Sequence, residues 1–221
     1  AAVSMLLGRV NKDGGMKILP ELPTAVEAAA GRSELAAKDF IGYLAGIAAG
    51  KVAAPAVMMA YEANPVYALP QNTALAPAFE KAGFLVSFST YMDETASKAD
   101  LTMPNPTSYE RFEDAQTPYG VGAAMLAASA PVAEPLYNSK PTVDVILGVA
   151  SGLGIDLGYE SSEAVYQAKA EKAGADWDSL VEGSAYVSDS TESGSIKFAA
   201  SVLSKAPCPR AAKSLLLLTQ S

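Results

Sequence analysis

The order of apolar and polar residues predicts alternating strands and helices in the middle of the chain. Residues 56–60 form a short continuous apolar run, which is typical of a strand buried on both faces of a parallel sheet. A helix is predicted over 72–82, with Gly83 as its end, and a second buried strand over 84–88. Asp93 is a candidate N-cap for a helix that reaches Ala99, and a third strand is predicted over 101–103. This order predicts an α/β fold with a doubly wound, mostly parallel sheet, whose ligands would bind where the strands end.

The segments on either side of this sheet are predicted to be mainly helical. We therefore expect a helical lead-in over 1–50, the α/β domain over 51–122 and a helical and loop extension over 123–212. The individual elements are helices over 1–9, after Thr24, over 39–49, 142–153, 162–173 and 176–182, loops over 110–131 and 184–195, and strands over 196–202 and 215–218.

Composition narrows the class of protein. Half of the 221 residues are apolar and 18% are charged, which predicts a globular chain with a sizeable core. The net charge of -8 repels phosphate backbones and argues against a nucleic-acid partner. The apolar run Leu215 to Leu218 is far shorter than the roughly 18 to 20 residues that span a bilayer, so no membrane-spanning segment is predicted.

The scarcity of histidine and cysteine limits the chemistry that this chain can carry alone. It has no histidine and one cysteine, Cys208, which stands between two prolines and fits an incidental loop position better than a reactive thiol. Zinc sites, iron-sulfur clusters and nucleophile–histidine active sites all need more of these residues. We therefore predict no metal ligand, no catalytic residue and no complete active site within this segment.

Two groups of polar residues are candidates for chemistry. The acidic residues could act as general acids or bases, but Asp93 and Glu94 fit a helix N-terminus better, and Glu110, Glu113 and Asp114 fit solvated loop charges. The loop after the first strand pairs Asn64 with Pro65. A carboxamide at a strand end could bind a phosphate, ribose or pterin edge, or could simply form an Asx turn, and composition favours neither.

These motifs together resemble the third domain of the molybdopterin oxidoreductase superfamily, and the resemblance covers nearly the whole chain. The residues that carry it are Asn64-Pro65, the strand 84–88, Asp93-Glu94-Thr95-Ala96 with Ala99-Asp100, Pro104 and Glu110, together with Asn11, Gly14 and Gly15 in a preceding turn. Residues 213–221 resemble the first strand of the family's C-terminal barrel. The resemblance implies that the chain is an internal portion of a larger subunit.

Several binding residues follow from the resemblance. Asn64 matches the asparagine that contacts a molybdopterin guanine dinucleotide in pterin-binding members, and Pro65 and Tyr67 would line the same cofactor. Ser89 and Thr90 lie at the neighbouring strand end and are second choices, while Asp93, Thr95 and Asp100 would hold the loop in shape. Ala68 stands where those members have a serine or threonine, so one hydroxyl contact is missing.

The amino-acid sequences of the loops resemble those in the large subunits of quinone reductase complexes, alternative complex III and polysulfide reductases. That likeness implies electron transfer between a periplasmic donor and menaquinone, on the periplasmic side of the cytoplasmic membrane. It also implies iron-sulfur, multihaem cytochrome c and integral membrane quinone-binding partner subunits, with membrane contact only through them. An iron-sulfur cluster would belong to the rest of the subunit or to a partner.

Three alternatives stay open. The subunit could be a structural scaffold without a cofactor, which Ala68 favours. It could be a bis-pterin reductase of polysulfide, thiosulfate or tetrathionate. It could also be an unrelated α/β domain, which the breadth of the match disfavours.

Overall fold

The computed structural model describes residues 2–26, 37–69, 72–118, 120–188 and 190–191, in two compact units. The smaller unit contains residues 1–20 and 190–221, and its described part begins with helix α1 (Ala2–Leu6). The predicted turn follows, with Asn11 and Gly14 at positive φ and an isolated bridge between Val10 and Met16. The larger unit, residues 21–189, contains both sheets.

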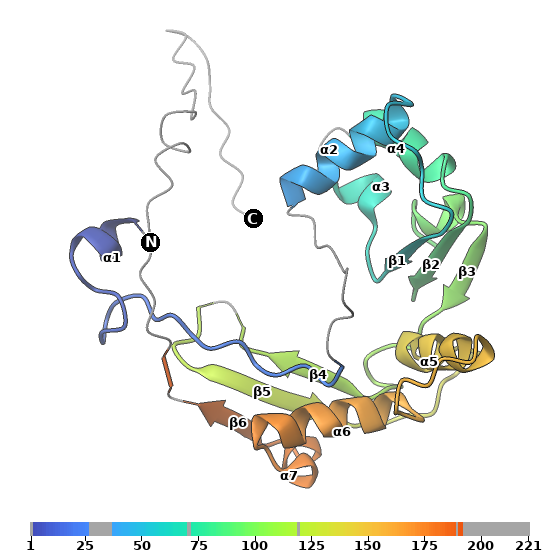
Figure 1. Cartoon of the computed structure of the whole chain (residues 1–221). Coiled ribbons are helices and arrows are strands. Elements are labelled where there is room, and N and C mark those ends of the chain that lie inside the picture. The colour runs from blue at the N-terminus through green and yellow to red at the C-terminus, as the bar shows by residue number, and fades with distance from the viewer. Residues whose placement is uncertain (1, 27–36, 70–71, 119, 189, 192–221) are drawn as a thin grey trace, which may run out of the picture. The chain divides into compact units, whose positions relative to one another are not determined.

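The predicted parallel sheet is present in the larger unit. Its strands are β1 (Met58–Tyr61), β2 (Leu85–Ser89) and β3 (Leu101–Pro104), all parallel and in the order β1-β2-β3 (Figure 1). The connections contain the short helix α3 (Pro65–Ala68), helix α4 (Asn72–Glu80) and a single 3₁₀ turn, η1 (Ala96–Lys98). The carboxyl ends of the three strands therefore lie along one edge, as the order of elements predicts.

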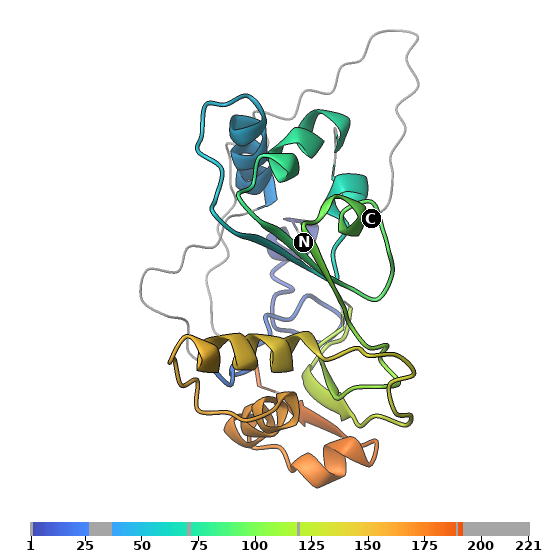
Figure 2. The same ribbon diagram turned by 90° about the vertical axis from the view of Figure 1, so that its right-hand side faces the viewer.

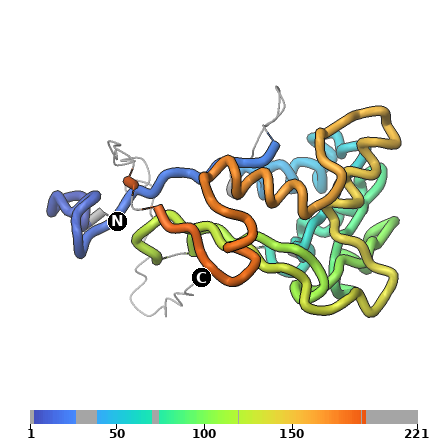
Figure 3. Tube along the Cα trace, turned by 90° about the horizontal axis from the view of Figure 1, so that it is seen from below, coloured from blue at the N-terminus to red at the C-terminus, as the bar shows by residue number. Residues whose placement is uncertain are grey.

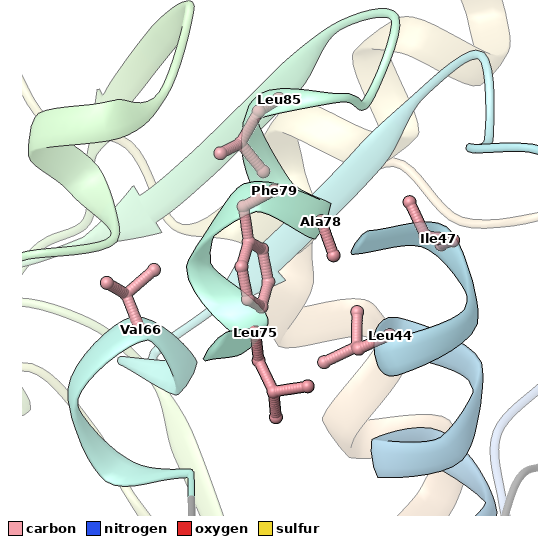
Figure 4. Close-up of a cluster of buried hydrophobic side chains, with 7 residues drawn as sticks. All are labelled: Leu44, Ile47, Val66, Leu75, Ala78, Phe79 and Leu85. Carbon is pink, nitrogen blue, oxygen red and sulfur yellow. The ribbon is translucent and has the colours of Figure 1, made fainter. Parts of the chain in front are cut away.

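A hydrophobic core joins helices α2 (Ala37–Ala48) and α4 to the sheet (Figure 4). Leu44 and Ile47 of α2 pack with Phe79 of α4 and Leu85 of β2, and all four are nearly or fully buried. Lys81 donates from Nζ to the Ala48 carbonyl oxygen over 2.7 Å, which satisfies a carbonyl at the end of α2. This core fixes the helices against one face of the sheet.

The sheet departs from the prediction in the burial of its first strand. Every residue of β2 is buried, but Met59 and Tyr61 of β1 are about half exposed. The expectation that β1 is buried on both faces is wrong: alternate residues of a strand share a face, and the face of Met59 and Tyr61 is half exposed while Ala60 on the opposite face is buried. An apolar run identifies a strand without saying how many neighbours cover it.

A second sheet occupies a region predicted as loop. Strands β4 (Glu113–Gln116), β5 (Ala124–Ser129) and β6 (Ala185–Ser188) pair antiparallel in the order β4-β5-β6. The loop predictions over 110–131 and 184–195 are therefore wrong where these strands form. The chain turns back after helix α7 so that β6 runs beside β5 (Figure 3). The polar and alanine-rich segments lack the alternation that marks a strand, and pairing with distant residues stabilises them.

Three predicted helices follow the β4–β5 hairpin in the chain and are confirmed (Figure 2). They are α5 (Thr142–Gly152), α6 (Ser162–Ala173) and α7 (Trp177–Val181). Ser161 caps α6 by accepting the Ala164 amide over 3.2 Å, and Asp176 caps α7 through the Ser179 amide over 3.0 Å. Trp177 and Leu180 of α7 pack with Leu126 of β5 to form the core beneath the antiparallel sheet.

Several predicted elements lie outside the described residues. These are the helix after Thr24, the strands over 196–202 and 215–218, Cys208, and the barrel strand over 213–221. The boundaries at residues 50, 122 and 212 stay predictions, and the antiparallel sheet takes strands from both sides of residue 122. No helix among the described residues combines the length and apolar character needed to cross a membrane.

Candidate functional site at the carboxyl edge of the parallel sheet

The Asn-Pro loop is held by the segment that follows β2. Asn64 accepts hydrogen bonds at Oδ1 from the Thr95 hydroxyl over 2.8 Å and the Thr95 amide over 3.2 Å. Its Nδ2 donates to Glu94 Oε2 over 2.5 Å. Thr95 is fully buried, and its Oγ1 also accepts from the Val66 amide over 3.1 Å. The Asn64 carboxamide thus links the two motifs that lie 30 residues apart.

Asp93 and Thr95 hold the loop in shape as predicted, whereas Asp100 bonds at the opposite end of the strands, where β2 and β3 begin. Asp93 accepts the Ala96 amide at Oδ1 over 2.7 Å, which caps the 3₁₀ turn, and Asp100 accepts the Leu85 amide at Oδ2 over 2.8 Å. Ser89 donates to the Tyr91 carbonyl oxygen over 2.8 Å. These bonds fix the loop that follows β2 and the start of β3.

Three of the five predicted binding residues line one cavity. A cavity of about 300 Å³ is lined by Asn64, Ser89 and Thr90, together with Glu62, Ala63, Tyr91 and Asp93. Pro65 does not line it but occupies the first turn of α3, where proline is favoured, and Tyr67 projects from the same helix with most of its surface exposed. The contact of any of the five residues with a cofactor stays a prediction.

A second cavity adjoins the first and was not predicted. It has a volume of about 420 Å³, shares Glu62, Thr90 and Tyr91 with the first cavity, and is also lined by Thr107, Ser108, Arg111 and Glu113. Most residues in both linings carry a hydroxyl or a carboxylate group. The site is therefore a polar crevice along the ends of all three parallel strands.

An ion-paired network built on Glu62 forms one wall of this crevice. Glu62 has a φ of 44°, which is uncommon for a residue with a side chain. Its Oε1 accepts from Asn105 Nδ2 over 2.6 Å and pairs with Arg111 Nη2 over 2.5 Å. Asn105 in turn accepts the Thr142 amide over 3.1 Å at the start of α5. The network therefore joins the ends of β1 and β3 to helix α5.

Arg111 is the buried cation of this network. Its side chain is 7% exposed and donates from Nε to Glu113 over 2.7 Å, while Nη1 has no partner among the described residues. Burial alone would lower the pKa of Arg111, but the hydrogen bonds to Glu113 and Glu62 outweigh it and raise the pKa. The guanidinium is charged at every pH of interest and neutralises part of the surrounding carboxylate charge.

The interpretation of Glu110, Glu113 and Asp114 as solvated loop charges needs correction. Glu113 and Asp114 belong to β4 and pair with Arg111 and with Lys169 of α6. Glu110 binds the Thr107 and Leu136 amides, each over 2.9 Å. Residues 49 positions apart form the Glu62–Arg111 pair, and no local pattern marks it. The only local signal for this pair is the positive charge of Arg111 within an acidic segment.

The charge of the crevice does not suit a dinucleotide diphosphate. Among the described residues, the crevice is lined by the carboxylates of Glu62, Asp93 and Glu113 and by the single guanidinium of Arg111, and Glu94 is bonded to Asn64. Ala68 supplies no hydroxyl, and the Asn64 carboxamide is already bonded on both sides. The described residues alone therefore do not form a site for the diphosphate of a molybdopterin guanine dinucleotide. Among the described residues, no cluster of three or more His, Cys, Asp or Glu side chains is arranged to hold a metal ion.

Comparison with known proteins adds sequence relatives to this geometry. No protein-family model matches the chain. The chain is 42% identical over 205 residues to the "Menaquinone reductase, molybdopterin-binding-like subunit" of Nitratidesulfovibrio vulgaris, a match that covers 93% of the chain and 30% of that protein. It is 31% identical over 102 residues to the "Dimethyl sulfoxide/trimethylamine N-oxide reductase" of Rhodobacter capsulatus, covering 45% of the chain and 12% of that protein. The chain thus spans less than a third of either relative.

A solved structure supports the fold. Acetylene hydratase from Pelobacter acetylenicus superposes with a TM-score of 0.57 at 18% identity, over 67% of the chain and 20% of the hydratase. This likeness concerns the α/β fold alone. The expectation from the Asn-Pro and Glu-Thr-Ala motifs agrees with both sequence relatives, and the chain belongs to the molybdopterin oxidoreductase superfamily.

Proposed function

We propose that the chain is part of the large subunit of a quinone-linked respiratory oxidoreductase. The observation that carries the proposal is the 42% identity, over 93% of the chain, to a protein named as a menaquinone reductase subunit. By this proposal the whole protein passes electrons between a periplasmic donor and menaquinone, on the periplasmic side of the cytoplasmic membrane. Its partners are iron-sulfur, multihaem cytochrome c and integral membrane quinone-binding subunits.

Within that complex, this segment supplies a framework and no reacting group of its own. Side chains at the carboxyl edge of the parallel sheet are already hydrogen-bonded to other protein groups, and the bonds between Asn64 and Thr95 stabilise the loop. Electron transfer would therefore use cofactors held by the remainder of the subunit or by its partners.

Enzyme assays on the native complex test this function. The complex that contains the full-length protein is purified, and reduction of a water-soluble menaquinone analogue is followed with a reduced c-type cytochrome as donor. We expect reduction by the intact complex and none by the same preparation from cells that lack the subunit. The proposal would be refuted if the donor reduces the haems of the intact complex but the quinone stays oxidised.

A second candidate, a scaffold subunit without pterin, is supported by the charge of the crevice. Its carboxylates outnumber its one guanidinium, and Ala68 lacks the family hydroxyl. Elemental analysis for molybdenum and tungsten, with fluorescence of the oxidised pterin, separates the two candidates in the same preparation. Molybdenum or tungsten, together with pterin, in amounts equal to that of the subunit would support a cofactor-binding subunit. Iron without molybdenum, tungsten or pterin would support the scaffold.

A further inference from the structure

Helix α5 receives its N-terminal cap from a residue of the parallel-sheet region. Pro141 stands at the cap position and makes no side-chain hydrogen bond there. The cap comes instead from Asn105, which follows β3 and lies 37 positions before Thr142. Its Oδ1 accepts from the Thr142 amide over 3.1 Å and from the Thr142 hydroxyl over 3.2 Å. The start of α5 therefore depends on how the buried Asn105 carboxamide is oriented.

The Glu62 carboxylate fixes that orientation. Glu62 Oε1 accepts from Asn105 Nδ2 over 2.6 Å. An ionised carboxylate only accepts hydrogen bonds, so it binds the nitrogen end of the carboxamide and leaves the oxygen end to Thr142. If the carboxamide turned over, Nδ2 would face the Thr142 amide, and two donors cannot bond to each other. The acceptor at Glu62 and the cap on α5 are thus linked through one side chain.

The backbone at Glu62 points to a use of this carboxylate. Its φ of 44° costs free energy in a residue with a side chain, whereas glycine adopts such a conformation freely. The Glu62 side chain lines both cavities of the crevice, and its Oε1 also pairs with Arg111 Nη2 over 2.5 Å. A group that enters the crevice therefore meets the same side chain that orients Asn105.

A second hydrogen bond continues from α5 to α6. Asp144, in the first turn of α5, accepts the amide of the buried Ser162 at Oδ1 over 2.6 Å. Ser162 is the first residue of α6, so the starts of the two helices are bonded to each other. Lys169 of α6 also pairs with Asp114 of β4, which attaches α6 by a route that does not pass through α5. A change at the start of α5 should therefore reach Ser162 in weakened form.

We propose that Glu62 and Asn105 form a conformational relay, by which the polar crevice controls the start of α5 and, through Asp144, the start of α6. While Glu62 is bonded to Asn105, the cap on α5 is held. When a cation or a hydrogen-bond donor in the crevice withdraws the carboxylate, the carboxamide is free to turn over and the cap is lost. The hydrogen bonds of the relay all lie within this chain, so the proposal does not depend on the proposed function.

Hydrogen–deuterium exchange on the full-length protein tests the relay at amides that Glu62 does not touch. Glu62→Gly removes the carboxylate and suits the positive φ. We expect the Thr142 amide to exchange about tenfold faster in this variant, and the Ser162 amide to be accelerated less. The Ser179 amide, capped by Asp176 within α7, is the internal reference, and each rate is taken as a ratio to it. An unchanged ratio at Thr142 would overturn the proposal.

Two further variants separate the relay from a general loosening of the crevice. Glu62→Gln keeps an acceptor oxygen for Asn105 Nδ2, so the ratio at Thr142 should stay close to that of the unsubstituted protein. Glu113→Ala is the matched control, because Glu113 pairs with the same arginine, Arg111, and has no hydrogen bond to Asn105 among the described residues. It should leave the Thr142 amide protected. Equal acceleration at Thr142 in Glu113→Ala and Glu62→Gly would contradict the relay.

A double-mutant cycle tests whether the effect passes through Asn105. Asn105→Ala removes the cap itself, so the Thr142 amide should already exchange fast in that variant. Adding Glu62→Gly to Asn105→Ala should then change the Thr142 ratio no further, because the two substitutions break the same connection. If the two substitutions accelerate the Thr142 amide additively, Glu62 acts by another route and the relay is wrong.

Discussion

Thr95→Val tests whether the link between the Asn-Pro loop and the Glu-Thr-Ala segment has the strength that the geometry implies. Valine keeps the shape of the fully buried threonine but removes the hydroxyl that donates to Asn64 and accepts from the Val66 amide. Asn64 Oδ1 keeps its bond from the Thr95 amide, so the Val66 amide is the one buried group left without a partner. An unpaired buried donor costs about 2 kcal/mol.

This cost predicts a measurable local opening. A loss of about 2 kcal/mol corresponds to roughly 30-fold faster exchange if the loop opens on its own. Hydrogen–deuterium exchange on the intact protein should show this at Val66 and through residues 92–99, while the Leu85 amide, held by Asp100, serves as internal reference. Thr95→Ser keeps the hydroxyl and should leave the Val66 amide protected. Equal exchange at Val66 in the two variants would refute the reasoning.

Three further predictions follow from the same network and its surroundings. Arg111→Met should destabilise the protein by about 2 kcal/mol in urea unfolding, because it leaves the partly buried carboxylates of Glu62 and Glu113 close together without their cation. Arg111→Lys should recover only part of this, since an ammonium cannot reproduce the guanidinium's fixed donors. Hydrogen bonds from the Leu136 and Thr107 amides lower the pKa of Glu110. The Leu136 amide should therefore stay protected from hydrogen exchange above the ordinary glutamate pKa of 4.5 and lose that protection as the pH falls through the lowered pKa. Glu110→Gln should remove that pH dependence. Burial raises the pKa of Tyr166 to about 12, so stability contributed by its neutral form should be complete below pH 10 and fall as the pH rises from 10 towards 12. Ultraviolet titration should show this phenol ionisation at high pH. If the Tyr166→Phe variant still shows it, the ionisation belongs to another tyrosine.

The local patterns of the sequence determine most of the secondary structure. The apolar run near Met58, the capping residues Ser161 and Asp176, and Gly174 at a φ of 78° each act within a few residues, so they can be identified without a fold. The binding candidates Asn64, Ser89 and Thr90 could also be predicted, because parallel strands bring their carboxyl ends to one edge. The family resemblance rests on the same local motifs.

The tertiary structure decides what depends on distant residues. The segment 124–129 becomes a strand because β4 and β6 pair with it, although its alanine-rich sequence has no strand alternation. Glu62 follows β1, and Arg111 lies in the segment after β3; they meet because both strands end at the same edge of the parallel sheet. Asn105, which also follows β3, bonds to Thr142 at the start of helix α5. Half-burial of β1 likewise depends on which of its two faces other elements cover. Pairing, burial and ion pairs between residues far apart in the chain depend on the positions of both partners, and a local sequence pattern describes only one of them.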